Sequence, residues 1–162
     1  MVDLALSLRE TALSLMIRES QWFWPICESI HFVGLALVLG IAGLFDFRLM
    51  GFVRHLSVAS VKSLMPWAMV GFALNLFTGA AFLIGAPDQY VTNPAWWAKV
   101  AALVLAGANA GIFESTMGGA ALAIPAGGDT TGGMKAVGAV SLLSWLGVLY
   151  WGRMLPFIGS AF

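Results

Sequence analysis

The chain has 162 residues, of which 60% are hydrophobic and only 10% are charged, and its formal net charge is zero. A soluble domain of this size could not bury so much apolar surface, because soluble domains are about half apolar and about a quarter charged. The balanced charge, without a basic stripe, argues against nucleic acid as a partner, and the single cysteine, Cys27, cannot form an intramolecular disulfide.

Residues 1–20 are predicted to form one amphipathic helix. Polar side chains recur at helical spacing along one side, at Asp3, Ser7, Glu10, Ser14 and Arg18. Apolar side chains fall largely on the other side, at Leu4, Leu8, Leu13 and Ile17. We expect this helix to lie in the membrane interface, although packing on its own bundle or on a neighbour fits the pattern equally well.

Four apolar segments follow, and each is long enough to cross a bilayer, which takes about 20 helical residues. They are predicted at about residues 24–45, 65–86, 94–113 and 136–152. The segments lack the alternating pattern of membrane β-strands, and helices satisfy every backbone polar group in lipid. The sequence therefore predicts an all-α fold, in which an integral membrane four-helix bundle spans residues 21–162 after the N-terminal interfacial helix.

The charged residues indicate an orientation for the bundle. The eight basic residues divide equally between the two membrane sides, but three of one side's four lie in the short connection 46–64, at Arg48, Arg54 and Lys62. Cytoplasmic loops carry an excess of basic residues. We therefore expect this loop to be cytoplasmic and both termini to be periplasmic, in the inner membrane of a bacterium. The glycine-rich connection 114–135 is either a mobile loop or an extension of the third helix.

Small and amide side chains predict how the helices pack. Gly107 and Gly111 form a GxxxG pattern in the third span, and Gly71 and Asn75 share a face of the second. Such faces permit close helix contact in lipid, within one protomer or between protomers. Asn75 and Asn109 are expected to hydrogen-bond to neighbouring helices.

The strongest functional signal is a set of charged and polar residues at one end of the bundle. Glu28 and His31 share a face of the first span, and an ionisable group inside a membrane helix marks a candidate functional site. In an up-and-down bundle, Lys99 at the start of the third span and Arg153 at the end of the fourth lie in the same membrane layer, beside Trp97.

This set of residues suits haem. A neutral imidazole binds haem iron, basic side chains bind the propionates, and a carboxylate orients the imidazole. His55 lies roughly 20 Å or more from His31 along the chain, so it cannot be the second ligand within one protomer. The iron would then keep five ligands, take a non-His ligand, or bind His31 of a second copy.

Two other interpretations stay open at this point. In the first, His31 hydrogen-bonds to Glu28 while Lys99 and Arg153 neutralise the acid, and the cluster is only structural. In the second, Cys27, Glu28 and His31 form a small metal site, although three ligands from one helix rarely surround an ion.

Four segments resemble an uncharacterised family of small bacterial four-helix membrane proteins. They are ESIHFVGLALVLGIAGLFDFRLMG (28–51), PWAMVGFALNLFTG (66–79), NPAWWAKVAALVLAGANAGIF (93–113) and WLGVLYWGR (145–153). The resemblance covers nearly the whole chain after residue 20, and it implies the same fold without implying an activity.

More remotely, the pattern is similar to the CopD-like group, which includes the membrane haem-binding protoporphyrinogen oxidase. In that oxidase a first-helix His precedes a GLF…R stretch, and a Lys opens the third helix after a Trp. Here His31, residues 43–45, Arg48, Trp97 and Lys99 fall on comparable positions. The resemblance implies that His31 is a haem b ligand and that Lys99 lies near the site.

One departure limits this resemblance, because Asn109 and Glu114 occupy the region where the oxidase has a further His. We therefore predict a b-type haem protein that passes electrons between its haem and a quinone or redox partner, rather than an oxidase of porphyrinogen. The alternatives are a non-catalytic subunit or scaffold of a homo-oligomer or larger complex, and a carrier of a metal or small molecule.

Overall fold

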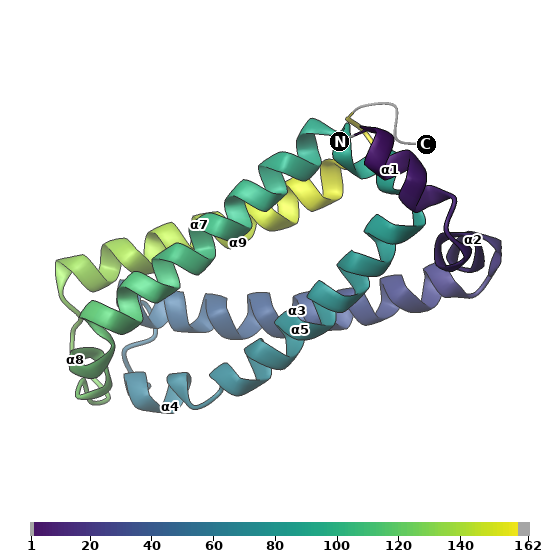
Figure 1. Cartoon of the computed structure of the whole chain (residues 1–162). Helices are drawn as coiled ribbons and strands as arrows, with labels where there is room; N and C mark the ends of the chain where they lie inside the picture. The colour runs from purple at the N-terminus through teal and green to yellow at the C-terminus, as the bar shows by residue number, and fades with distance from the viewer. Residues whose placement is uncertain (1, 159–162) are drawn as a thin grey trace.

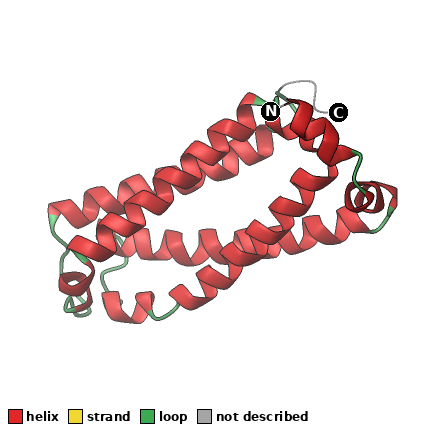
Figure 2. Ribbon diagram, viewed as in Figure 1, coloured by secondary structure: helices red, strands yellow, loops and turns green. Residues whose placement is uncertain are grey.

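The computed structural model describes residues 2–158 and shows an all-α protein that is 80% helical (Figures 1 and 2). Residue 1 and residues 159–162, which the sequence assigns to the N-terminal helix and to the bundle, lie outside the described residues. The four long helices are α3 (Phe23–Met50), α5 (Met65–Gly85), α7 (Pro94–Thr116) and α9 (Gly132–Met154). All four are long and apolar enough to span a membrane, so the predicted fold class is confirmed and the chain is a multi-pass membrane protein.

The outer surface of the long helices is apolar. Phe32 on α3, Phe77 on α5, Val104 on α7 and Leu143 on α9 are each more than half exposed. Large apolar side chains exposed on every long helix would promote aggregation in water, whereas lipid solvates them. The exposed faces are therefore consistent with a bilayer around the bundle.

Local signals fix where the long helices begin and end. α3 continues to Met50, beyond its predicted end at residue 45, because the first left-handed residue is Gly51, with φ of 90°. The amides of Gly51 and Phe52 then bond back to the last turn of α3, as in a Schellman cap. Asn93 and Thr131 cap the N-termini of α7 and α9 with their side-chain oxygens.

The long helices form two hairpins, α3 with α5 and α7 with α9, which are joined by contact between α3 and α9. A Cβ atom on Gly71 would lie 2.7 Å from the Gly34 carbonyl oxygen, so the backbones of α5 and α3 touch at this point. A Cβ atom on Gly138 would similarly lie 2.9 Å from the Asp46 carbonyl oxygen, where α9 crosses α3. Figure 1 shows the hairpins converging at this end and diverging toward the end that carries both termini.

The convergent end holds the main apolar core. Two short helices, α4 (Val58–Lys62) and α8 (Gly118–Leu122), cover it. The buried core residues are Phe45, Leu49, Val58, Val61, Phe113, Ala121 and Met134. The connection predicted at 114–135 is thus partly helical, because α7 continues to Thr116 and α8 follows at once.

The N-terminal segment is two helices rather than the single helix predicted over residues 1–20. α1 (Val2–Arg9) stops before Thr11, whose side-chain oxygen accepts the Ser14 amide and caps α2 (Ala12–Glu19). α2 packs on α5 through the buried Ile17, and α1 packs on α6 (Pro87–Val91) with an ion pair between Arg9 and Asp88. The segment thus packs on its own bundle, and its position in a membrane interface stays a prediction.

Candidate functional site

His31 lies on the inward face of α3. It shares the helical spacing of Leu35, Val38, Ala42 and Phe45, and of these Val38 and Phe45 are buried in the bundle. The His31 side chain itself is half-buried. The candidate ligand therefore faces the interior of the bundle rather than the surrounding lipid.

The His31 imidazole is held by Thr78 on α5, a residue that is fully buried. His31 Nδ1 and Thr78 Oγ1 are 2.7 Å apart, and the Thr78 hydroxyl also lies 2.7 Å from the Leu74 carbonyl oxygen. A threonine in a helix commonly donates its one proton to the carbonyl four residues earlier. We therefore assign Nδ1–H as the donor to Thr78, which leaves the lone pair on Nε2. Within residues 2–158, Nε2 has no hydrogen-bond partner.

Asn75, one turn before Thr78 on α5, fixes the backbone of α3 beside the imidazole. With its amide in the orientation that satisfies both groups, its nitrogen lies 2.7 Å from the His31 carbonyl oxygen and its oxygen 3.0 Å from the Leu35 nitrogen. The same nitrogen is 3.3 Å from His31 Nδ1, where it could donate only to an unprotonated Nδ1. We assign the Nδ1 proton to the shorter contact, with Thr78. Asn75 thus bonds across helices, as predicted.

Asn109 confirms the same expectation for the other hairpin. Its side-chain nitrogen donates to the Val137 carbonyl oxygen over 3.1 Å and so links α7 to α9. The side chains of both asparagines therefore serve helix packing.

One aromatic ring lies beside the imidazole on the α5 side. Phe82 lies one turn beyond Thr78, and its ring centroid is 5.6 Å from that of His31. Trp24 of α3 stacks on Phe82 at 5.0 Å, nearly parallel. Phe82 therefore gives the imidazole an apolar neighbour, and Trp24 holds Phe82 in place.

Lys99 lies against α9 rather than against α3. Its side chain runs along α9, where a Cβ atom on Gly152 would lie 3.8 Å from Lys99 Nζ. Among residues 2–158, no hydrogen bond joins Lys99 to His31.

Glu28 does not orient His31, although the sequence had suggested this role. Glu28 is exposed, and no hydrogen bond joins it to His31 in the described part of the chain. Its charge instead acts on Tyr90 of α6. Burial and the Glu28 charge together raise the pKa of Tyr90 to about 12. The orienting role belongs to Thr78.

Arg153 and Trp97 have partners of their own at the terminal end. The Arg153 guanidinium lies 5.2 Å from the centroid of the Phe157 ring, and the Trp97 indole donates to the Val91 carbonyl oxygen over 3.0 Å. Both side chains are exposed. Trp97 thus bonds to the end of α6 and Arg153 to a residue beyond α9, and neither contacts His31 in the described part of the chain.

A metal site built from Cys27, Glu28 and His31 is not favoured. Among residues 2–158, no three His, Cys, Asp or Glu side chains come together in a group that could hold an ion. Cys27 is buried whereas Glu28 is exposed, so the two point to different environments.

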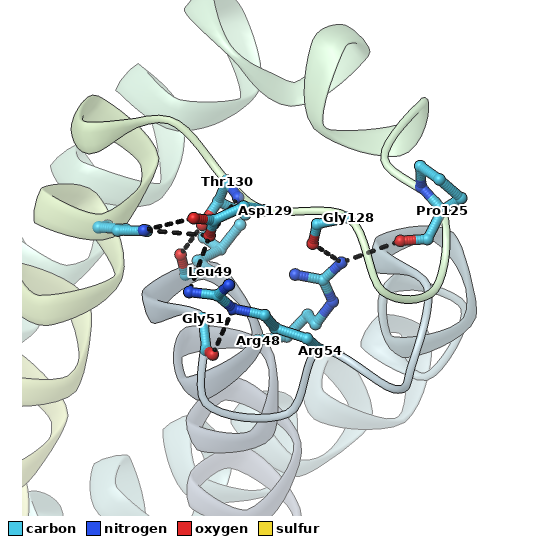
Figure 3. Close-up of polar contacts among 9 residues, drawn as sticks. Arg48, Leu49, Gly51, Arg54, Pro125, Gly128, Asp129 and Thr130 are labelled. Atoms are coloured by element: carbon cyan, nitrogen blue, oxygen red, sulfur yellow. Dashed lines mark hydrogen bonds and ion pairs between the residues drawn. The ribbon is translucent and has the colours of Figure 1, made fainter.

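Sequence reasoning missed a second polar site, at the convergent end (Figure 3). The Arg48 side chain is fully buried, and its Nε donates to the Leu56 carbonyl oxygen over 2.6 Å. Its Nη2 donates to the carbonyl oxygens of Gly128 at 3.1 Å and Pro125 at 3.2 Å, so the arginine holds the glycine-rich loop against α3. Nη1 has no partner among the described residues. The sequence predicts Arg48 in the connection 46–64, whereas it lies in the last turn of α3 and is buried.

We find no match for this chain among protein-family models, curated proteins or solved structures. The resemblance to the CopD-like group therefore stays a prediction.

Proposed function

We propose that this chain is a membrane-embedded b-type haem protein that takes part in electron transfer, with His31 Nε2 as an axial ligand of the iron. The observation that supports the proposal is the pairing of His31 with Thr78. A haem or metal ligand needs one ring nitrogen fixed by a hydrogen bond and the other left free, and His31 meets both conditions inside the bundle.

The neighbouring residues suit such a group. Lys99 would supply a positive charge to neutralise a propionate, and Phe82 supplies an apolar contact beside the imidazole. When bound, haem would supply a one-electron redox centre in the membrane. The protein's own contribution is to orient the imidazole through Thr78 and to provide a cation and an apolar wall.

The proposed setting is a bacterial inner membrane. Both termini lie at the same end of the bundle, as four crossings require (Figure 1). The loop that joins α3 to α5 carries Arg54 and Lys62, so the positive-inside rule favours the cytoplasm for this end and the periplasm for the termini. A quinone or a redox protein is the proposed exchange partner.

Two histidine variants test the proposal, because the chain has only two histidines. We expect His31→Ala to remove haem from the detergent-purified protein while the helical content is kept. His55→Ala is the matched control and should keep its haem, because His55 lies exposed in the loop after α3. Retention of haem by His31→Ala would refute the assignment.

A second candidate function is a non-catalytic subunit of an oligomer, and one observation favours it. Gly107 and Gly111 on α7 are exposed, and a Cβ atom on either would have no neighbour within 4 Å. The GxxxG pattern is thus unused within the protomer and is free to pack against another helix. If it does, Gly111→Leu should lower the oligomeric state measured by light scattering in detergent.

A further inference from the structure

We propose that an anionic phospholipid binds where α3 and α9 meet, with an acyl chain in a groove between these helices and its phosphate beside Arg54 and Lys135. This proposal is independent of the haem site, which lies on the opposite, inward face of the bundle.

The groove runs along the outer surface of α3 and α9. Gly40, Gly43 and Phe47 line it from α3, and Leu142 and Leu146 line it from α9. A Cβ atom on Gly40 or Gly43 would have no neighbour within 4 Å, so the glycines leave the groove floor free. Phe47 and Leu146 are each more than 40% exposed, so the groove opens toward lipid.

The groove leads to two cations at the convergent end. Phe47 lies one turn before Gly51, where α3 ends, and Arg54 folds back so that its Nε donates to the Gly51 carbonyl oxygen over 3.0 Å. On α9, Lys135 lies two turns before Leu142 on the same face. Both helices of the groove therefore present a basic side chain at the same membrane surface.

The charges at this surface do not balance. Asp129 accepts an ion pair from Arg54 at 3.3 Å and one from Lys135 at 3.0 Å, so one carboxylate serves two exposed cations (Figure 3). The buried Arg48 is matched at this end of α3 by the buried Asp46, so the excess positive charge rests on the exposed Arg54 and Lys135. An excess of positive charge beside the end of an apolar groove fits a ligand with an anionic head and an apolar tail.

This excess of positive charge favours an anionic lipid in the groove over a second copy of the chain or a zwitterionic lipid. A second copy docked on the same surface by a two-fold axis would bring like charges together, which is unfavourable. A zwitterionic lipid could fill the groove but would gain little from the extra cations. Basic clusters at the cytoplasmic ends of membrane helices attract anionic headgroups, with roughly a fivefold gain in binding for each cation.

The test is native mass spectrometry of the full chain released from micelles that contain equal amounts of phosphatidylglycerol and phosphatidylcholine. We expect the wild-type protein to retain phosphatidylglycerol preferentially and K135Q to reduce this preference about fivefold. K62Q is the matched control, because Lys62 pairs with Glu114 elsewhere, and it should keep the preference.

A second pair of variants tests the groove itself. Gly43→Leu places a side chain in the groove and should reduce the retention of both lipids several-fold. Gly79→Leu, at an equally open glycine on α5, should leave retention unchanged. Equal retention of the two lipids by the wild-type protein, or identical behaviour of K135Q and K62Q, would overturn the proposal.

Discussion

Thr78 on α5 holds the imidazole of His31 on α3, with 2.7 Å between the hydroxyl oxygen and Nδ1, although the two residues are 47 positions apart in the chain. The contact depends on the close approach of the two helices at Gly34, one turn from His31, and Gly71, two turns from Thr78. Helix packing therefore determines which imidazole nitrogen is held by a hydrogen bond.

Replacing Thr78 by valine should weaken haem binding without abolishing it. Valine keeps the shape of threonine but removes the oxygen that fixes Nδ1, and the loss of such an orienting partner typically costs about 10–100-fold in affinity. Thr78→Ser restores the hydroxyl and should restore most of the affinity. Haem titration followed by absorbance measures both variants, and equal affinities for valine and serine would contradict the orienting role.

Gly71→Ala should destabilise the bundle, because its Cβ would lie 2.7 Å from both the Gly34 carbonyl oxygen and the Leu37 Cβ. Overpacking of this kind costs about 1–3 kcal/mol. Gly79→Ala on the same helix meets no atom within 4 Å and should be neutral or slightly stabilising. Unfolding by sodium dodecyl sulfate, followed by circular dichroism, compares the two variants. Equal losses of stability in the two variants would show that the close contact at Gly71 contributes little to the stability of the bundle.

Arg48→Met should loosen the glycine-rich loop. Removing the guanidinium leaves the carbonyl oxygens of Leu56 and Gly128 without a donor. The Pro125 carbonyl oxygen loses one of two donors and keeps the Gly128 amide at 3.1 Å. Hydrogen bonds to charged groups contribute about 1.5–3 kcal/mol to stability. We expect a loss of this size in the free energy of unfolding and faster proteolysis of residues 123–131.

Arg54→Gln is the control for this prediction. Its ion pair with Asp129 is half-exposed and should contribute less than about 1 kcal/mol. If Arg54→Gln exposed the loop to protease as much as Arg48→Met, the buried arginine would not be what holds the loop.

Tyr90 should ionise at unusually high pH. Burial, and secondly the Glu28 charge, raise its pKa to about 12, so folding favours the neutral phenol. The stabilisation linked to this shift is complete below the ordinary pKa near 10 and is lost as the pH rises toward 12. Absorbance titration of Tyr150→Phe isolates Tyr90, the other tyrosine. Adding Glu28→Gln should lower the pH at which Tyr90 ionises. An unchanged ionisation pH would mean that the Glu28 charge does not act on Tyr90.

The four spans follow from the sequence because length and apolar composition determine whether a helix can cross a bilayer. The predicted ends of the spans were less accurate. The first span was predicted to end at residue 45, whereas α3 continues to Met50 because Gly51 is the first residue in a left-handed conformation. The break between α1 and α2 at Thr11 was also missed, because periodicity alone continues through it.

The candidate site was only partly predictable. Helical spacing predicts that His31 lies on the inward face of α3. An up-and-down topology predicts that Lys99 lies at the same end of the bundle as His31. The choice of Thr78 over Glu28 cannot be predicted in this way, because it depends on the rotation of α5 against α3 that the glycine contact sets. The burial of Arg48 depends likewise on a loop that folds back from residues 125–128.

The measurement that tests the central claim most directly is an optical spectrum of the detergent-purified protein from cells supplied with haem, first oxidised and then reduced with dithionite. The account predicts a Soret band and a sharp α-band on reduction. A featureless spectrum would contradict the haem proposal and would favour the subunit function.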